Sequence, residues 1–248
     1  MMGEVRILGI QFAGQRFDDA IEQMLAAAAR GPRLRAHFAN VHSTVEAVRD
    51  RSLAAVFASA GMICTDGMPL VWLARRQGVP FAERVSGPDA MLAVCDRGRA
   101  LSLRHYFFGG APGVAEAVSR KLSARLPGLI VAGTQSPPFR PATAIEDDPV
   151  IEAINQTRPD VIWVALGAPK QEFWAAAHES RLEAKLILPV GAAFDFHSGR
   201  IRRAPRWMRR VGLEWLYRLA SEPRRLGRRY LVTNVRFLLL LARARLHR

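Results

Sequence analysis

Short apolar segments typical of strands alternate with longer segments of helical composition over most of this chain of 248 residues. The clearest apolar segment is Asp160-Val161-Ile162-Trp163-Val164-Ala165-Leu166, in which every residue after the first is apolar. Strands that are apolar throughout are typical of the centre of a parallel sheet, where both faces are covered. Regular alternation with helices predicts the α/β class. We therefore expect a Rossmann-like, mostly parallel sheet flanked by helices.

The pattern predicts the following elements along the chain. Strands are expected at 5–10, 34–39, 61–65, 103–108, 129–132, 160–166 and 185–190, and helices at 17–30, 43–59, 69–76, 88–99, 114–126, 145–157 and 170–180. Ser43 and Glu46 have the spacing of a capping box, which predicts that the second helix starts at Ser43. The Pro-rich stretch 134–141 is the best candidate for a break between lobes or for a mobile flap.

Four of the predicted strands end in turns rich in Gly, Asn, Asp and Gln, at 40–43, 65–69, 109–113 and 167–172. The carboxyl ends of parallel strands meet at one edge of the sheet, where ligands bind in α/β folds. Asp66 lies in the second turn, where it either caps the following helix or takes part in chemistry. Gly67 beside it indicates a backbone position that needs freedom or close approach.

The other turns contain groups suited to bind anions and sugars. Gly109, Gly110 and Gly113 place backbone N–H groups at a predicted helix N-terminus, which favours a diphosphate, although a plain tight turn has the same composition. The segment matches neither the dinucleotide nor the P-loop fingerprint. Lys170 is suited to hold a phosphate and Gln171 to bind a sugar or base, unless this is an ordinary solvated first turn.

The positive charge is concentrated at the C-terminus. Residues 200–248 contain fifteen Arg and two Glu, a charge of +13 out of a total of +14. Such a tail is suited to phosphates, on nucleic acid or on lipid. Its apolar residues, including Leu226, Tyr230 and Phe237, favour an anionic membrane surface over nucleic acid. The alternative is two ordinary helices that pack on the body and leave the Arg side chains in solvent. We expect the catalytic domain at 1–199 and an Arg-rich helical, membrane-associating appendage at 200–248.

Several features bound the chemistry and the compartment. Cys64 and Cys95 are too few for a disulfide framework or a zinc site, so a reducing cytoplasm is expected. There is no signal peptide pattern and no apolar run long enough to span a membrane. Without a DxD motif at a strand end, we expect metal-independent activity and no cofactor. Asp195, between two Phe residues, is either a buried structural carboxylate or a site residue.

Five segments in order resemble the WecG/TagA/CpsF glycosyltransferases (family 26). They are Thr65-Asp66-Gly67-Met68-Pro69, Glu83-Arg84-Val85-Ser86-Gly87-Pro88-Asp89, Val164-Ala165-Leu166-Gly167-Ala168-Pro169-Lys170-Gln171-Glu172, Arg203-Ala204-Pro205, and Gly212-Leu213-Glu214-Trp215-Leu216-Tyr217-Arg218 with Glu222-Pro223 and Arg225. The combination spans nearly the whole chain. It is far more specific than any one segment.

The resemblance implies a bacterial, inverting enzyme on the cytoplasmic face of the membrane. Such enzymes move a sugar from a UDP-sugar, here one like UDP-N-acetylmannosamine or a UDP-hexose, to a sugar on a polyprenyl diphosphate during surface polysaccharide synthesis. The family's motif Asp matches Asp66, expected to be the general base, and its motif Gln matches Gln171. The family's appendage is implicated in membrane attachment and in completing the site.

One departure concerns the second strand end, where the family often has Thr-x-Asn and this chain has Phe38-Ala39-Asn40. The difference bears on the sugar that is transferred or accepted, and the role of His42 beside it stays open. Arg84 and Asp89 are interpreted either as a structural ion pair or as ligand contacts. The expected substrate-binding residues are Asn40, Thr65, Gly67, Arg84, Gly109, Gly110, Gly113, Lys170, Gln171, Glu172, Arg203, Arg218 and Arg225.

The expected partners are the UDP-sugar donor, the polyprenyl-diphosphate-linked acceptor and an anionic membrane surface on the inner face of the bacterial cytoplasmic membrane. A homo-oligomer is possible on this sequence. The alternative to an enzyme is an α/β protein that binds nucleic acid or anionic lipid through its basic tail without transferring a sugar.

Overall fold

The computed structural model describes residues 2–137 and 148–246. The strands are β1 (Met2–Ile7), β2 (Ile10–Gln15), β3 (Leu34–Ala39), β4 (Met62–Thr65), β5 (Arg104–Gly109), β6 (Ile130–Gln135), β7 (Val161–Ala165) and β8 (Leu186–Pro189). The helices are α1 (Phe17–Ala29), α2 (Val41–Arg49), α3 (Arg51–Ala58), α4 (Met68–Arg76), α5 (Gly87–Arg97), α6 (Val114–Arg125), α7 (Asp148–Gln156), α8 (Lys170–His178), α9 (Ala193–His197), α10 (Arg206–Arg210), α11 (Glu214–Ser221) and α12 (Pro223–Leu246), with a 3₁₀ turn at Gly98–Leu101.

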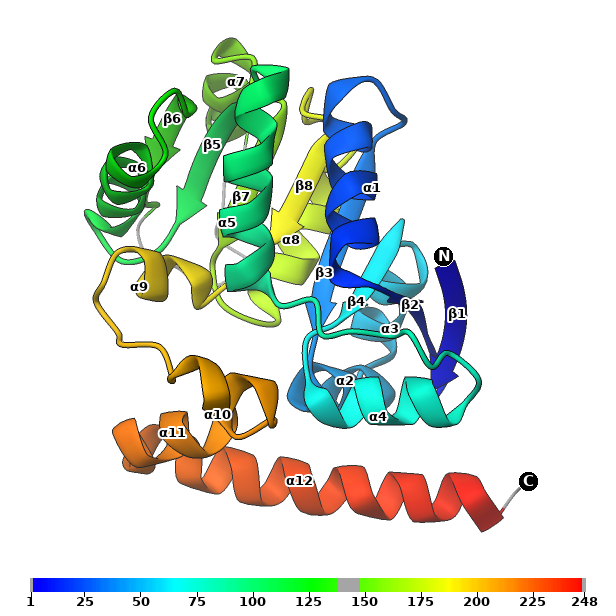
Figure 1. The fold of residues 1–248 in the computed structure, drawn as a ribbon. Coiled ribbons are helices and arrows are strands. Elements are labelled where there is room, and N and C mark those ends of the chain that lie inside the picture. Colours follow the sequence, from blue (N-terminus) through cyan, green and yellow to red (C-terminus); the bar gives the residue numbers. More distant parts are fainter. Residues whose placement is uncertain (1, 138–147, 247–248) are drawn as a thin grey trace.

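Within the described residues the strands form one eight-stranded sheet in the order β1-β2-β4-β3-β8-β7-β5-β6 (Figure 1). The pair β1–β2 is antiparallel, and every other neighbouring pair is parallel. Helices α1, α5, α6 and α9 pack their apolar side chains on one face. Helices α2, α3, α4, α7 and α8 cover the other. The expected α/β class with a mostly parallel sheet is confirmed. The four polar turns therefore do lie at one edge.

The predicted first strand at 5–10 is wrong, because the chain reverses inside it. Leu8 and Gly9 have φ values of 51° and 84° and form the turn of a β1–β2 hairpin, with Ile7 opposite Ile10. Positive φ at both central residues is the geometry that suits a two-residue hairpin. Apolar and polar residues alternate on both sides of Gly9, so the sequence pattern gave no indication of this turn.

The predicted capping box at Ser43 and Glu46 is also wrong. Helix α2 starts earlier, because Asn40 is its N-cap and accepts hydrogen bonds from the backbone N–H groups of His42 (2.9 Å) and Ser43 (3.2 Å). The Ser43 hydroxyl accepts in return from the Asn40 N–H at 2.9 Å. Of the expected lobe break, residues 134 and 135 belong to β6, and 138–141 lie outside the described residues.

The C-terminal appendage, residues 200–248, is described to residue 246. Its long helix α12 runs past the carboxyl edge of the sheet (Figure 1). Leu226, Thr233 and Phe237 on one side of α12 are at most 5% exposed. Phe237 packs into the core cluster shared with α2 and α3, and Thr233 Oγ1 lies 3.3 Å from His42 Nδ1. The appendage is thus packed on the body through one apolar side of α12.

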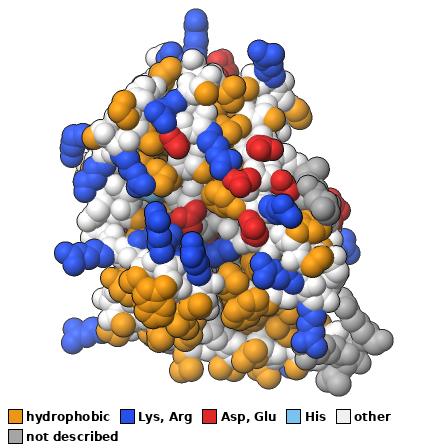
Figure 2. Space-filling view, viewed as in Figure 1, with side chains coloured by type: hydrophobic (Ala, Val, Ile, Leu, Met, Phe, Trp, Pro, Cys, Tyr) orange, Lys and Arg blue, Asp and Glu red, His pale blue; other side chains and the backbone are white. Residues whose placement is uncertain are grey.

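The outward side of the appendage is also apolar. Figure 2 shows hydrophobic side chains gathered in the lower half of the molecule, over α4 and the C-terminal helices, with Lys and Arg side chains around them. The exposed apolar residues of this region are Trp72, Trp207, Val211, Trp215, Leu216, Leu231, Val235, Leu238 and Leu239, with exposed fractions from 41% to 70%. Among the described helices, none has both the length and the hydropathy needed to cross a membrane.

Candidate active site

Asp66 directly follows β4 at the carboxyl edge of the sheet. Its backbone N–H donates to the Ala39 carbonyl at 2.9 Å, which ties the end of β4 to the end of β3. Thr65 holds the segment before α5 alongside, because its hydroxyl donates to the Glu83 carbonyl and its own carbonyl accepts from the Val85 N–H. These contacts bring Arg84, eighteen positions further on, against Asp66. The Thr65 side chain is fully buried, so its role is to stabilise the turn through its hydrogen bond to Glu83.

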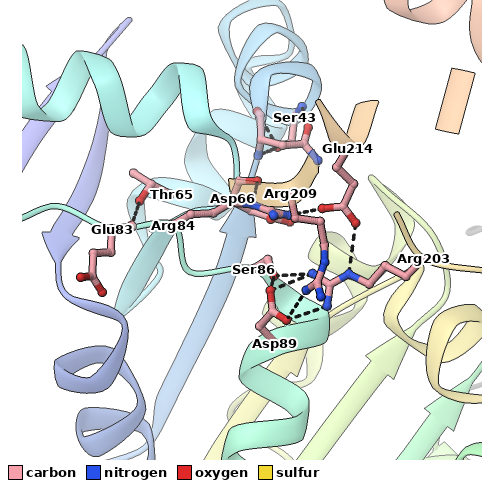
Figure 3. A network of polar contacts seen from close by, with 11 residues as sticks. Ser43, Thr65, Asp66, Glu83, Arg84, Ser86, Asp89, Arg203, Arg209 and Glu214 are labelled. Atoms are coloured by element: carbon pink, nitrogen blue, oxygen red, sulfur yellow. Dashed lines mark hydrogen bonds and ion pairs between the residues drawn. The ribbon is translucent and has the colours of Figure 1, made fainter. Parts of the chain in front are cut away.

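Arg84 joins Asp66 to the appendage (Figure 3). Its Nε donates to the Asp66 backbone carbonyl and its Nη2 to Asp66 Oδ1, both at 3.2 Å. The same Nη2 donates to Glu214 Oε2 at 2.6 Å. Asp66 and Arg84 side chains are each 18% exposed. A carboxylate, a guanidinium and a second carboxylate from α11 therefore share one half-enclosed position.

A second arginine continues this network. Arg203 donates through Nε to Glu214 Oε1 at 3.1 Å and forms a bidentate pair with Asp89, at 2.6 Å and 2.7 Å. Its Nη2 also donates to Ser86 Oγ at 3.1 Å. Arg209 donates to the same Asp89 at 3.1 Å. Of the two interpretations left open for Arg84 and Asp89, a mutual ion pair is wrong, since Arg84 pairs with Asp66 and Glu214 and Asp89 pairs with Arg203 and Arg209.

The two carboxylates at the body end of the network differ in acidity. Burial raises the pKa of Asp66 to about 7, and the nearby Glu214 adds to the rise, while Arg84 and Arg203 oppose it. Burial acts in the same direction on Asp89, but hydrogen bonds from Arg203 and Ser86 outweigh it and lower the pKa to about 2. Asp66 can therefore exchange a proton near neutral pH, as a general base must. Asp89 stays charged.

The β5 turn is shaped by close backbone packing. A Cβ at Gly109, whose φ is 119°, would lie 2.5 Å from the Ala165 carbonyl oxygen, and one at Gly110 would lie 2.9 Å from Val114. These glycines are required by the fold itself. Gly113, with φ of 79°, is the N-cap of α6, so the turn does present a helix N-terminus at the carboxyl edge.

The β7 turn places Gln171 and Glu172 inside the protein, at 5% and 7% exposure. Gln171 Nε2 donates to Glu172 Oε1 at 3.0 Å, and burial raises the pKa of Glu172. Gln171 Oε1 is buried without a hydrogen-bond partner among the described residues. Lys170 opens α8 beside them. The alternative of an ordinary solvated first turn is wrong for Gln171 and Glu172.

Strand order separates these groups along the edge. Strands β3, β8 and β7 lie between the Asp66 turn after β4 and the glycine turn after β5. The Gln171 turn lies between them, and Asn40 lies beside Asp66 after β3. An extended ligand would be needed to touch all four.

The appendage contributes Arg218, whose Cζ lies 5.7 Å from the centre of the Phe196 ring, with Arg203 at 5.8 Å from the same ring. The side chain of Arg225 lies outside the described part of the chain. Asp195 has Arg200 as its ion-pair partner at 3.8 Å, a long surface contact. Among the described residues no three His, Cys, Asp or Glu side chains are grouped to hold a metal ion.

Sequence reasoning did not nominate Glu214, Ser86 or Arg209 as site residues. The sequence did contain one indication that Glu214 is important, because it is one of two acidic residues in a tail with fifteen arginines. An isolated carboxylate in such surroundings is expected to be paired. Its partners were not predictable, because Arg84 lies 130 positions away.

Comparison with known protein families identifies the group to which this chain belongs. The family model of the WecG/TagA/CpsF glycosyl transferases matches residues 5–248. The chain belongs to this family. It is therefore a glycosyltransferase, as the five sequence segments predicted.

Family members with curated names include an enzyme of Bacillus spizizenii, which is 30% identical over 75% of this chain and 71% of its own length. One from Bacillus subtilis is 30% identical over 71% of this chain and 67% of its own. One from Staphylococcus aureus is 30% identical over 68% of this chain and 65% of its own. All three are named N-acetylglucosaminyldiphosphoundecaprenol N-acetyl-beta-D-mannosaminyltransferase.

Proposed function

We propose that this enzyme transfers N-acetylmannosamine from UDP-N-acetylmannosamine to the N-acetylglucosamine of a polyprenyl-diphosphate-linked acceptor. The configuration at the anomeric carbon of the transferred sugar is inverted. The names of the relatives support these substrates. The observation that carries the proposal is Asp66, which combines a place at the carboxyl edge, 18% exposure and a pKa raised to about 7.

In the proposed reaction Asp66 takes the proton from the acceptor hydroxyl. The acceptor oxygen bonds to the anomeric carbon as the bond from that carbon to the UDP oxygen breaks, so UDP leaves with the electron pair. Among the described side-chain hydrogen bonds, the Asp66 carboxylate is held only through Oδ1. Oδ2 is then the oxygen that receives the proton.

The negative charge that develops on UDP needs donors. Arg84 has Nη1 left for a phosphate, because its contacts to described residues use Nε and Nη2. The N-termini of α6 and α8, Lys170, Arg218 and Arg225 are the further proposed donors. Arg203 is a weaker candidate than the sequence suggested, since its guanidinium already binds Asp89, Ser86 and Glu214.

We propose that the reaction requires no metal ion. Turnover should therefore be unchanged by EDTA. Loss of turnover with EDTA and its recovery with Mg²⁺ or Mn²⁺ would contradict this proposal.

We also propose that the enzyme is peripheral on the inner face of the cytoplasmic membrane, held by the appendage. Leu231 and Leu238 on the outward side of α12 are 70% and 66% exposed, and Trp207 of α10 is 62% exposed. Apolar residues among arginines are the composition of a helix lying in a membrane interface. The mixture of exposed leucines and arginines favours a membrane over nucleic acid, because a nucleic-acid backbone provides phosphates for the arginines but no apolar surface for the leucines. An association between copies of the chain stays a prediction.

The test uses the purified full chain with a soluble short-chain N-acetylglucosaminyl-diphosphate lipid and, in separate reactions, UDP-N-acetylmannosamine, UDP-N-acetylglucosamine and UDP-glucose. We expect transfer from the first, with a β linkage identified by NMR. Transfer from another UDP-sugar alone would correct the donor. No transfer from any of them would reject the function.

A further inference from the structure

Glu214 occupies an unusual position, because one carboxylate from the appendage is shared between two arginines of the site. Its Oε2 accepts from Arg84 Nη2 at 2.6 Å, and its Oε1 from Arg203 Nε at 3.1 Å. The Glu214 side chain is 14% exposed. Glu214 belongs to α11 of the appendage and Arg84 to the body, so Glu214 reaches Arg84 only when the appendage is docked. The bidentate Arg203–Asp89 pair holds the appendage in this position by fixing Arg203 to α5.

The Nη2 atom of Arg84 divides its contacts unequally. It lies 3.2 Å from Asp66 Oδ1 but 2.6 Å from Glu214 Oε2. Charge-assisted hydrogen bonds are strongest at short distance, so Glu214 holds the larger share of this group. Without Glu214, the same guanidinium would have Asp66 as its remaining carboxylate in this position. A full pair with Arg would make Asp66 a weaker base, because an adjacent Arg lowers an Asp pKa by about 1–3 units.

We propose that Glu214 is a positioning residue that draws Arg84 away from Asp66 when the appendage is docked, and so leaves the Asp66 carboxylate able to accept a proton. The assignment rests on the proposed function of Asp66. It couples docking of the appendage to the strength of the base. A merely anchoring role would predict that any break in the network has the same effect on turnover.

The charged and titratable groups around Asp66 give the direction of the pH effect. Arg84 faces it from the segment before α5, Glu214 from α11, Arg203 from the segment before α10, and Cys64 from β4. Glu214 raises the pKa of Asp66, and the two arginines lower it. Removal of the Glu214 charge should therefore shift the titration of Asp66 to lower pH.

The experiment compares Glu214→Gln with three other variants in the full chain. Asp89→Asn weakens the anchor at Arg203 but leaves the appendage docked in most molecules, so the Glu214 contacts stay in place. Glu214→Asp keeps the charge, and Glu22→Gln removes one exposed carboxylate of α1 as the matched control. The titration of Asp66 is followed by carboxyl-carbon NMR, which needs no turnover. The kcat and KM with a soluble acceptor are measured across pH.

We expect Glu214→Gln to lower the Asp66 midpoint by about one pH unit and, at pH values where Asp66 is ionised in both proteins, kcat by up to about tenfold, with the donor KM changed less than about twofold. Asp89→Asn and Glu22→Gln should leave the midpoint in place, and Glu214→Asp should move it less than Gln does. An unmoved midpoint in Glu214→Gln, or an equal shift in Asp89→Asn, overturns the inference. Wild-type turnover in Asp66→Asn would instead reject the role of Asp66 itself, so the two failures are distinct.

Discussion

Arg203 and Asp89 lie 114 positions apart in the chain and form a bidentate ion pair, with Nη1–Oδ1 and Nη2–Oδ2 distances of 2.6 Å and 2.7 Å. The pair fastens the segment before α10 to the first turn of α5. Because Arg203 also binds Glu214, the same guanidinium aligns α11 with the Asp66 site.

We expect Asp89→Asn to loosen the appendage by about 1 kcal/mol, because an amide offers one acceptor oxygen where the carboxylate offers two. The loss is small because Asp89 is 35% exposed and solvent screens its ion pairs. Hydrogen exchange should accelerate in α11 and be unchanged in β7. Asp96→Asn is the control, because Asp96 is on the same helix and pairs with the nearby Arg99. Equal exchange in wild type and Asp89→Asn would show that the pair does not hold the appendage.

The pH dependence of this anchor follows from the lowered pKa of Asp89. The folded value of about 2 lies below the unfolded value of about 3.9. Its contribution is therefore fully present above about pH 4 and is lost as the pH falls toward 2.

Asp66→Asn should separate activity from stability. We expect turnover to fall by about 10²–10⁴-fold, the usual contribution of a general base. Because the pKa of Asp66 is raised to about 7 in the folded protein, ionisation of this carboxyl lowers the free energy of unfolding. Wild-type stability should therefore decline between about pH 4 and pH 7 relative to the variant, which should unfold at the higher temperature at pH 8. Thermal unfolding at pH 5 and pH 8 measures this, and a less stable variant at pH 8 would contradict the burial argument.

Gly67 offers a cleaner probe of ligand approach than the glycines after β5. A Cβ at Gly67 would lie 3.8 Å from its nearest neighbours, and its φ of −133° suits any residue. The fold therefore does not require this glycine. We expect Gly67→Ala to keep the unfolding temperature within about 3 °C and to raise the KM for donor or acceptor. Unchanged kinetics would show that no substrate approaches this backbone.

Gly109→Ala is the contrast, because its Cβ would meet the Ala165 backbone at 2.5 Å. We expect it to destabilise the protein by more than about 1 kcal/mol, measured by urea unfolding. For the same reason Gly110→Val would not report on ligand binding. Its Cβ would already collide with Val114 inside the turn.

The outward side of α12 should determine membrane binding. We expect the double variant Leu231→Glu and Leu238→Glu to lose most sedimentation with anionic vesicles while turnover of a soluble acceptor is kept. These two side chains point away from the packed side that contains Phe237. Leu101→Glu is the matched control, since Leu101 is 49% exposed in the 3₁₀ turn after α5. Undiminished vesicle binding by the double variant would move the anchor elsewhere.

Much of the fold follows from local sequence. The apolar strand at Val161–Ala165, the strand at Leu34–Ala39 and the helix that begins at Phe17 were predicted at or close to their observed bounds. Such segments carry their own periodicity, and parallel pairing then fixes that the turns after β3, β4, β5 and β7 share an edge. The position of Asp66 at that edge is a consequence of sequence order alone.

Tertiary structure decided which groups meet Asp66. Local patterns do not record that Arg84 is divided between Asp66 and Glu214, because the three side chains come from segments up to 148 positions apart. The same holds for Arg203, which the sequence predicted as a phosphate ligand and the packing of α10 directs to Asp89. Composition determined that the tail is basic and apolar. The docking of the tail on the body determined which of its arginines are already paired with carboxylates. The pKa of the Asp66 carboxyl is raised by burial at this site, which the identity of the residue alone does not predict.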